Sequence, residues 1–267
     1  MRTVILSSLI ALSSALMPSA AMANHHEEAK ESAIAAAVAA PTRSEKNVAR
    51  DVYRHPTETL EFLGVKADQT VLEFSPGGGW YSEILGPLLA DDGTFYAAAF
   101  AGRYYEYFEK KMADNPGAFG NVELISWPVA DDSVTPGSVD TILTFRNIHN
   151  LVMGDTAASS FALFFKLLKS GGTLGVIDHR LPEDRDSALE KSSGYLKVST
   201  VKKLAEDAGF VLEAQSEINA NPKDTADWEK GVWTLPPALR NGETDREKYL
   251  AIGESDRMTL RFRKPAE

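Results

Sequence analysis

Glu73-Phe-Ser-Pro-Gly-Gly-Gly79 is a glycine-rich turn between an apolar run and an amphipathic one. The apolar run, residues 70–74, has the length of a buried strand, and residues 80–90 show the spacing of apolar side chains that is typical of a helix. Glycines in such a turn let the backbone approach a ligand closely and present N–H groups at the positive end of the helix. A turn of this kind can also be purely structural, but Glu73 lies where its carboxylate could reach an amino group. We therefore predict that a ligand binds at this turn.

The chain on either side repeats this alternation of short apolar strands and amphipathic helices. Strands are predicted over 70–74, 94–100, 122–126, 139–145 and 172–178, and helices over 80–90, 103–113, 156–169 and 198–208. The alternation predicts an α/β domain with a parallel sheet covered by helices on both faces. Two further strands, 210–217 and 257–264, are expected to pair as an antiparallel edge. Ligands of such sheets bind beyond the carboxyl ends of the strands, where the glycine-rich turn lies.

Two segments lie outside this alternation. Residues 44–63 predict two short helices with a break at His55-Pro56, because proline disfavours helical geometry in the residue before it. Residues 219–256, with Trp228, Trp233 and Pro236-Pro237, form a long insertion between the last two strands. Unstructured loops of this size are uncommon unless they are functional, so the insertion is a lid or substrate wall, or else a packed surface excursion. We expect residues 43–267 to form a single domain.

The N-terminus has the pattern of a cleaved export signal. Arg2 precedes the apolar stretch Val4–Met17, and Ala21-Met22-Ala23 matches a cleavage site, which predicts a cut after Ala23. The apolar stretch is shorter than the roughly 20 residues that span a bilayer, which argues against the alternative of a membrane anchor. Residues 24–42 form an Ala/Glu-rich leader that we expect to be weakly ordered. The mature protein is thus predicted to be periplasmic or secreted, without stable membrane insertion.

Charge and composition exclude several classes of partner. The chain has a formal net charge of −10 and no run rich in lysine or arginine, which argues against nucleic acid as the substrate. Cysteine is absent from the 267 residues, so disulfides, thiolate metal sites and a lipidated cysteine are excluded. We expect a small-molecule substrate, and the sequence leaves the oligomeric state open.

The order of these motifs resembles the class I S-adenosylmethionine (SAM)-dependent methyltransferases over residues 45–217. The resemblance rests on the glycine-rich turn, a later strand that begins Val139-Asp140, and Leu168-Lys-Ser-Gly-Gly172 before the next strand. In addition, segments 74–81, 144–150 and 177–180 are similar to a little-characterised bacterial group of exported, predicted methyltransferases. The resemblance implies a Rossmann-like, seven-stranded, mostly parallel sheet with helices on both faces and an antiparallel edge strand, and it implies SAM as the cofactor.

The resemblance also implies roles for single residues of the turn. Glu73, Ser75, Gly77 and Gly79, with Gly78 between the glycines, match the loop that holds the methionine part of SAM in the family. Ser75 replaces the first glycine of that loop, a change that is tolerable if its backbone angles are ordinary.

The second and third predicted strands depart from the family. The second ends in Ala97-Ala-Ala-Phe-Ala-Gly102, where the family usually has an acid that binds both ribose hydroxyls. Asp131 and Asp132 come a few residues later than the family's adenine-binding acid, and Ser126-Trp127 stand in its place. Trp127 could stack on an adenine, although a buried core tryptophan is an equal alternative.

Polar side chains follow the fourth and fifth predicted strands. Arg146, Asn147 and His149 come after one strand, and Asp178 and His179 after the next. We expect both groups to converge beside the glycine-rich turn, with Arg146 and Asn147 at the cofactor. His149 could act as a general base that Asp178 orients, and Asp178 or His179 could take the proton instead. In the structural alternative, His149 packs under the insertion.

Other chemistries compete for the same residues. His149, Asp178 and His179 offer the ligands of a mononuclear metal site, but their spacing selects no metal, and we predict none. A hydrolase lacks support because no Gly-x-Ser-x-Gly elbow occurs. A nicotinamide cofactor is disfavoured because the glycines do not follow the Gly-x-Gly-x-x-Gly spacing.

Two functional hypotheses follow from these observations. The first is transfer of a methyl group from SAM to a small or medium-sized acceptor in the exported compartment. The second is a non-methylating relative that keeps the fold and uses the cleft for another ligand or reaction.

Overall fold

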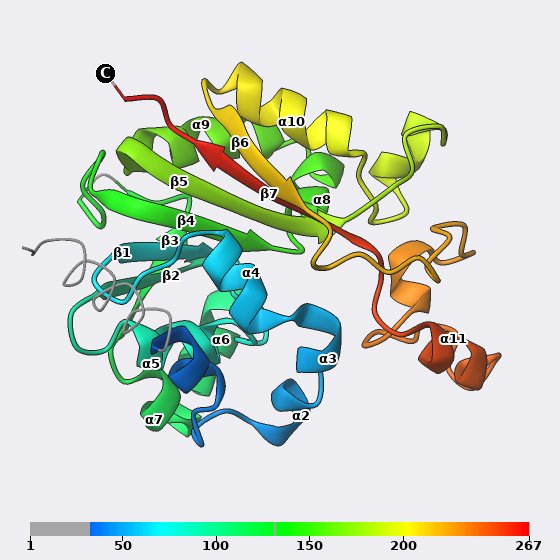
Figure 1. The fold of residues 1–267 in the computed structure, drawn as a ribbon, viewed down its shortest axis with the longest axis horizontal. Coiled ribbons are helices and arrows are strands. Elements are labelled where there is room, and N and C mark those ends of the chain that lie inside the picture. Colours follow the sequence, from blue (N-terminus) through cyan, green and yellow to red (C-terminus); the bar gives the residue numbers. More distant parts are fainter. Residues whose placement is uncertain (1–32, 131, 267) are drawn as a thin grey trace, which may run out of the picture.

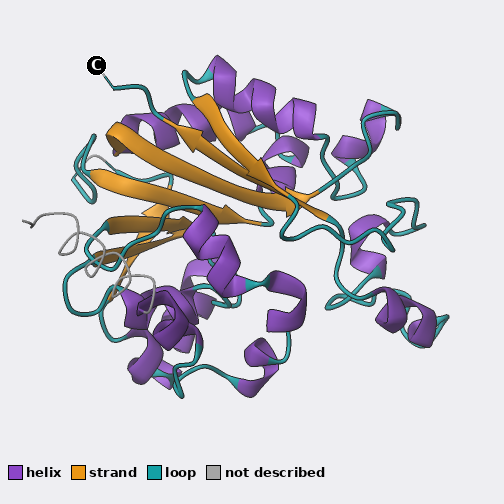
Figure 2. Cartoon of the chain, viewed as in Figure 1, coloured by secondary structure: helices purple, strands orange, loops and turns teal. Residues whose placement is uncertain are grey.

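The computed structural model describes residues 33–130 and 132–266, and it has a helix–sheet–helix architecture (Figures 1 and 2). The predicted signal peptide and Asp131 lie outside the described residues. The strands are β1 Thr70–Phe74, β2 Thr94–Phe100, β3 Val122–Trp127, β4 Val139–Phe145, β5 Leu168–His179, β6 Val211–Ser216 and β7 Arg257–Arg263. The helices are α2 Glu45–Val48, α3 Asp51–Arg54, α4 Pro56–Phe62, α5 Ser82–Leu88, α6 Arg103–Asp114, α7 Pro116–Phe119, α8 Ile148–Met153, α9 Ala157–Leu167, α10 Val198–Asp207 and α11 Arg246–Ile252, with 3-10 turns η1 Ser187–Lys191 and η2 Gly231–Thr234. None of the described helices is long and apolar enough to cross a membrane.

The seven strands form one sheet in the order β3-β2-β1-β4-β5-β7-β6. Strands β1 to β5 run parallel to one another, whereas β7 pairs antiparallel with both β5 and β6. This confirms the predicted fold class and all seven predicted strands, and it places the antiparallel strand β7 one position inside the edge. Because the chain reverses its strand order between β1 and β4, the carboxyl ends of these two strands flank the point where such sheets bind ligands.

The core lies on both faces of the sheet, because the strand residues are apolar on both sides. On one face, α8, α9 and α10 bury side chains such as Phe161, Phe164 and Val201. On the other face, α4, α5, α6 and α7 bury Leu60 and Phe108 among others. Figure 2 shows the two helical layers around the strands.

The N-terminal part of the domain is more extensive than predicted. Residues 33–38 are helical, and Ile34 and Ala37 are buried in the core, so the packed domain begins before Arg43. The predicted pair of helices over 44–63 consists of three short ones, with the break at His55 as expected, since this residue has a left-handed φ of 42°. We call residues 44–55 the arm. The arm and the insertion, residues 219–256, both lie beyond the carboxyl ends of the parallel strands (Figure 1).

Candidate functional site

A cavity of about 230 Å³ lies between the arm, the glycine-rich turn and the end of β4. Its walls are formed by Asn47, Arg50, Arg54, Glu73, Ser75, Pro76, Gly77, Gly78, Trp80, Tyr81, Phe145, Arg146 and Asn147. Most of the side chains that we predicted at the cofactor therefore converge, whereas Gly79 and Trp127 do not line the cavity. The volume is smaller than the roughly 300–1,000 Å³ of a site for a drug-sized ligand, and it suits an amino-acid-sized group.

The turn after β1 requires left-handed backbone at three positions. Gly77 has a φ of 56° and Gly79 of 73°, and Ser75 has a φ of 53°. The condition of ordinary backbone angles, under which the replacement of glycine by Ser75 would be tolerable, is therefore not met, because this φ lies in the left-handed region that favours glycine. Its backbone is fixed on both sides: its N–H donates to the Ala98 carbonyl at 2.8 Å, and its carbonyl accepts from Nδ2 of Asn147 at 2.9 Å.

Gly78 and Gly79 differ in what a side chain at each position would contact. A Cβ on Gly79 would lie 3.2 Å from the rings of Phe108 and Phe119, so Gly79 serves the packing of the turn against α6 and α7. A Cβ on Gly78 would meet nothing within 4 Å. Gly78 therefore leaves open space at the cavity, as a close approach of ligand to backbone requires.

Glu73 is the buried acid of the cavity. Only 2% of the residue is exposed, and Oε2 accepts from Oγ of Ser82 at 2.5 Å. Burial raises the pKa of Glu73 to about 7, and the hydrogen bond from Ser82 opposes this only in part. A bound ammonium group would favour the charged carboxylate, so the site gains electrostatic stabilisation when a cationic ligand enters.

The arm supplies an arginine cluster to the cavity that we did not predict. Nε of Arg50 donates to Glu254 at 2.7 Å and Nε of Arg54 at 3.0 Å, so one carboxylate of the insertion holds both guanidinium groups. Arg257 also contacts Glu254, at 3.2 Å. The i, i+4 spacing of Arg50 and Arg54 was visible in the sequence, but their acidic partner lies about 200 residues away.

Arg146 connects the cavity to the buried histidines. Its backbone is left-handed, with a φ of 62°, and its Nε donates to Nε2 of His179 at 3.2 Å. Burial outweighs the opposing attraction of Glu254 and, together with the charges of Arg257 and Arg50, lowers the pKa of Arg146 to about 10.

His149, Asp178 and His179 come together as predicted, with ligand atoms within 4.8 Å of one another. All three are buried, and none lines the cavity. Asp178 accepts from Nδ1 of His149 at 2.8 Å, from the backbone N–H of His149 at 3.0 Å and from that of His179 at 2.8 Å. Its carboxylate therefore caps the start of α8 as well as orienting the imidazole.

The surroundings of His179 oppose a cation. Its Nδ1 lies 2.5 Å from Oγ of Ser255, and its Nε2 accepts from Arg146. Burial, reinforced by the charge of Arg146, lowers the pKa of His179 well below 6.5, so its imidazole is neutral. A metal ion between the histidines would compete with the guanidinium group for the same nitrogen.

The described residues at which the resemblance would place the adenine contacts offer no buried charged anchor. Trp127 is 4% exposed and packs against Phe74 and Phe164 with ring centroids 4.7 and 5.1 Å apart, so it lies in the core. Ala97, Ala98 and Ala99 at the end of β2 are buried, and Asp132 is exposed. The structure thus places no predicted acid on this side of the cavity within the described residues.

The insertion packs as a wall beside the histidines. Val232 and Leu235 are buried, and the ring of Trp233 lies 6.3 Å from that of His149. Asp224 accepts from the hydroxyl of Tyr195 and from Nε1 of Trp228, at 2.9 and 2.8 Å, which fixes the insertion to the domain.

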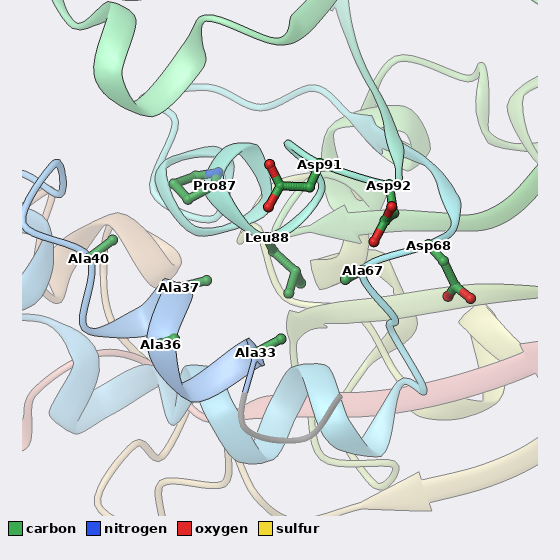
Figure 3. Close-up of a pocket in the computed structure, with 10 residues that line it drawn as sticks. All are labelled: Ala33, Ala36, Ala37, Ala40, Ala67, Asp68, Pro87, Leu88, Asp91 and Asp92. Carbon is green, nitrogen blue, oxygen red and sulfur yellow. The ribbon is translucent and has the colours of Figure 1, made fainter. Parts of the chain in front are cut away.

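A second and larger cavity, of about 570 Å³, lies between the N-terminal helix and the end of α5 (Figure 3). Alanines of the N-terminal helix line one side and Pro87 and Leu88 of α5 the other, and Asp68, Asp91 and Asp92 also belong to the lining. None of the predicted site residues lines this cavity. We therefore place the functional site at the smaller cavity beside the glycine-rich turn.

Solved structures with a similar fold include methyltransferases and a [4+2]-cyclase. A SAM-dependent methyltransferase from Aquifex aeolicus has a TM-score of 0.56 and 18% identity, with 81% of this chain and 93% of that one covered. The [4+2]-cyclase SpnF has a TM-score of 0.55 and 13% identity, covering 84% of each chain. An arsenic(III) SAM methyltransferase from Chlamydomonas reinhardtii has a TM-score of 0.51 and 14% identity, covering 87% of this chain and 73% of that one.

In sequence, no protein-family model and no curated protein matches the chain. The similarity to solved structures, at these identities, concerns the fold and not the reaction. The chain therefore has the Rossmann-like fold of the class I SAM-dependent methyltransferases.

Proposed function

We propose that this protein transfers a methyl group from SAM to a small acceptor, in the periplasm or outside the cell. The observation that supports this most directly is the cavity at the glycine-rich turn, where Glu73, the open space at Gly78 and Arg54 surround one amino-acid-sized volume. The pattern of residues 1–23 supports the exported location.

The cavity fits the methionine part of SAM. The carboxylate of Glu73 would accept from its ammonium group, and a guanidinium group of the arm would bind its carboxylate. The backbone at Gly78 allows a ligand to approach closely, and Asn147 holds the turn in place through the Ser75 carbonyl. When bound, SAM would supply an electrophilic methyl group on its sulfonium.

The residues of this chain would then contribute mainly by aligning the acceptor with the methyl group of SAM. A methyl transfer needs the acceptor in line with the sulfonium methyl, so a site that fixes both partners provides much of the rate enhancement without a general base. His149 and Asp178 lie outside the cavity wall, and Asp178 is already committed to two backbone N–H groups. We assign His149 and Asp178 to positioning α8, and His179 to positioning Arg146.

One observation favours the second hypothesis, a non-methylating relative. The buried alanines at the end of β2 offer no acceptor for ribose hydroxyls, and the [4+2]-cyclase SpnF shares the fold. A ligand without a ribose would not need an acid there.

Calorimetric titration with two related ligands tests the proposal. S-adenosylhomocysteine (SAH) contains the amino-acid part, and methylthioadenosine lacks it. We expect Gly78→Leu to weaken SAH binding more than methylthioadenosine binding, because Gly78 lines the cavity assigned to the amino-acid part that methylthioadenosine lacks. Gly78 is the better position for this test than Gly79, where a side chain would disturb Phe108 and Phe119. Unchanged SAH affinity in a folded Gly78→Leu protein would remove this cavity as the SAM site.

A further inference from the structure

Three buried donor atoms at the cavity have no hydrogen-bond partner among the described residues. They are Nδ2 of Asn47 and the Nη2 atoms of Arg50 and Arg54, and all three residues line the cavity. Asn47 and Arg54 are each 4% exposed. Buried polar groups in folded proteins are nearly always paired, so three unpaired donors at one cavity point to a ligand that brings hydrogen-bond acceptors.

These donors are held in place before any ligand binds. Nε of Arg54 donates to Glu254 at 3.0 Å, and its guanidinium carbon lies 4.7 Å from the centre of the Trp80 ring. Nε1 of Trp80 in turn donates to the carbonyl of Asn47 at 2.7 Å. The free nitrogens are therefore presented by a rigid frame, which lowers the entropic cost of binding.

The cluster also carries uncompensated positive charge. Four guanidinium groups, those of Arg50, Arg54, Arg146 and Arg257, interact with the two carboxylates of Glu254 and Asp178, which leaves two positive charges.

Glu73 also lines the cavity, but its carboxylate would be matched by the ammonium group of SAM, and the other titratable neighbours among the described residues do not remove the excess. Burial and the adjacent Arg146 keep His179 neutral by lowering its pKa, and burial raises the pKa of Tyr81 to about 12. Burial, which outweighs the opposing attraction of Glu254, lowers the pKa of Arg54 to about 9. Water could satisfy the free donors, but only an anion would also offset the charge.

We infer that the arginine cluster binds an oxyanion of the methyl acceptor in addition to the carboxylate of SAM, so that the acceptor is a small acid with a carboxylate or phosphate group. The assignment of this anion to the acceptor rests on the proposed function. SAM brings one carboxylate, whereas the cluster has two uncompensated charges. The sulfonium adds a further positive charge nearby, and an acidic acceptor would offset it.

A purely structural role of the cluster explains less. Glu254 joins the arm to the insertion through the Nε atoms of Arg50 and Arg54. That ion pair accounts for neither the free Nη2 atoms nor the free amide of Asn47.

Calorimetry with inorganic phosphate, with and without saturating SAH, tests the inference on the purified protein at low ionic strength. The test variant is Arg54→Gln. The matched control is Arg180→Gln, because Arg180 is already bonded to Asp256 at 2.7 and 2.9 Å and does not line the cavity. We expect phosphate to bind both with and without SAH, about 10- to 100-fold more weakly in Arg54→Gln, and within 2-fold of the original affinity in Arg180→Gln.

Three results would overturn the inference: mutually exclusive binding of phosphate and SAH, an equal loss of phosphate affinity in both variants, or no saturable binding of phosphate or of malonate while SAH binds. Tighter binding of malonate than of phosphate would support the inference with a carboxylate as the acceptor group, and the reverse order would support it with a phosphate. If SAH fails to bind while phosphate binds through Arg54, the proposed methyl transfer fails and the anion site stands.

A second variant covers the case in which Arg54→Gln does not fold. Asn47→Ala removes one free donor without a change of charge. We expect it to weaken phosphate binding about 5-fold, and unchanged affinity in this variant would count against the site.

Discussion

The unusual backbone of Ser75 is the main strain at the turn. A serine with a φ of 53° has its Cβ close to the neighbouring carbonyl, a conformation that costs an L-residue roughly 1–2 kcal/mol. The hydrogen bonds of its backbone to Ala98 and Asn147 hold it there. This strain lies at the cavity wall, where a precise backbone position determines how closely a ligand can approach.

We predict that Ser75→Gly raises the free energy of unfolding by up to about 1 kcal/mol. Relief of the left-handed strain exceeds the roughly 0.5–1 kcal/mol of backbone entropy that a glycine adds to the unfolded chain. Urea denaturation followed by circular dichroism measures the difference. Ser75→Ala is the control, since it keeps the strain, and we expect its stability to stay within 0.5 kcal/mol of the original protein. A lower free energy of unfolding in Ser75→Gly than in the original protein would show that the backbone of Ser75 is not strained.

The raised pKa of Glu73 predicts a pH dependence of stability. In the unfolded chain this carboxyl titrates near 4.5, and in the folded protein near 7, so the folded state holds a proton that the unfolded state has lost between these values. The free energy of unfolding should therefore fall by up to about 3 kcal/mol as the pH rises from 4.5 to 7, and level off above it.

Thermal unfolding of the original protein and of Glu73→Gln, between pH 4.5 and 8, tests this titration. The neutral amide cannot titrate, so its stability curve should lack the decline. If the free energy of unfolding falls with pH equally in both proteins, the group that titrates is not Glu73.

At the scale of elements, the arm and the insertion depend on a single carboxylate. Glu254 contacts the side chains of Arg50 and Arg54 from the arm and of Arg257 from β7. Burial alone would raise its pKa, but the guanidinium groups, led by Arg54 and Arg257, outweigh burial and lower the pKa to about 2. The carboxylate therefore stays charged and keeps two distant segments together over the cavity.

We predict that Glu254→Ala lowers the free energy of unfolding by about 3–5 kcal/mol, because it leaves several buried guanidinium groups unpaired. Limited proteolysis should then cut within residues 44–55 faster than in the original protein. The control is Glu217→Ala, whose exposed carboxylate pairs with Arg180 at 2.7 Å and should cost less than about 1 kcal/mol. Similar losses in the two variants would mean that the cluster does not hold the arm.

The start of α8 depends on another buried carboxylate. Because Asp178 accepts from two backbone N–H groups and from His149, we predict that Asp178→Ala costs about 2–4 kcal/mol of unfolding free energy. Calorimetric measurement of SAH affinity at a temperature where the variant is folded separates positioning from ligand contact. A positioning residue should change this affinity by less than about 10-fold. A larger effect on affinity without a loss of stability would place Asp178 in contact with the ligand.

For the whole molecule, the sequence predicted the sheet better than the site. The strand ranges agree because apolar runs alternate with amphipathic helices and end at glycines. Strand β5 begins at Leu168 and not at 172, since Leu168 pairs with Val139 ahead of an irregular register. Residues 44–63 contain three short helices where two were expected, because neighbouring contacts determine the ends of such short elements.

The site was predictable only where its residues follow strand ends. The convergence of Arg146, Asn147 and Asp178 followed from the parallel topology. The pairing of Arg50 and Arg54 with Glu254 was not predictable, since no local pattern relates residues 204 and 200 positions apart. The sequence left open whether Trp127 stacks on a ligand or lies in the core, because a strand-end tryptophan can face either side.

Calorimetric titration of the purified protein with SAM and with SAH shows whether the cavity at the glycine-rich turn is a SAM site. We predict saturable, micromolar, one-to-one binding of both ligands, which Gly78→Leu weakens. No binding of either ligand to protein that circular dichroism shows to be folded would contradict this prediction, and would leave the arginine-lined cavity to an acidic ligand of a non-methylating protein.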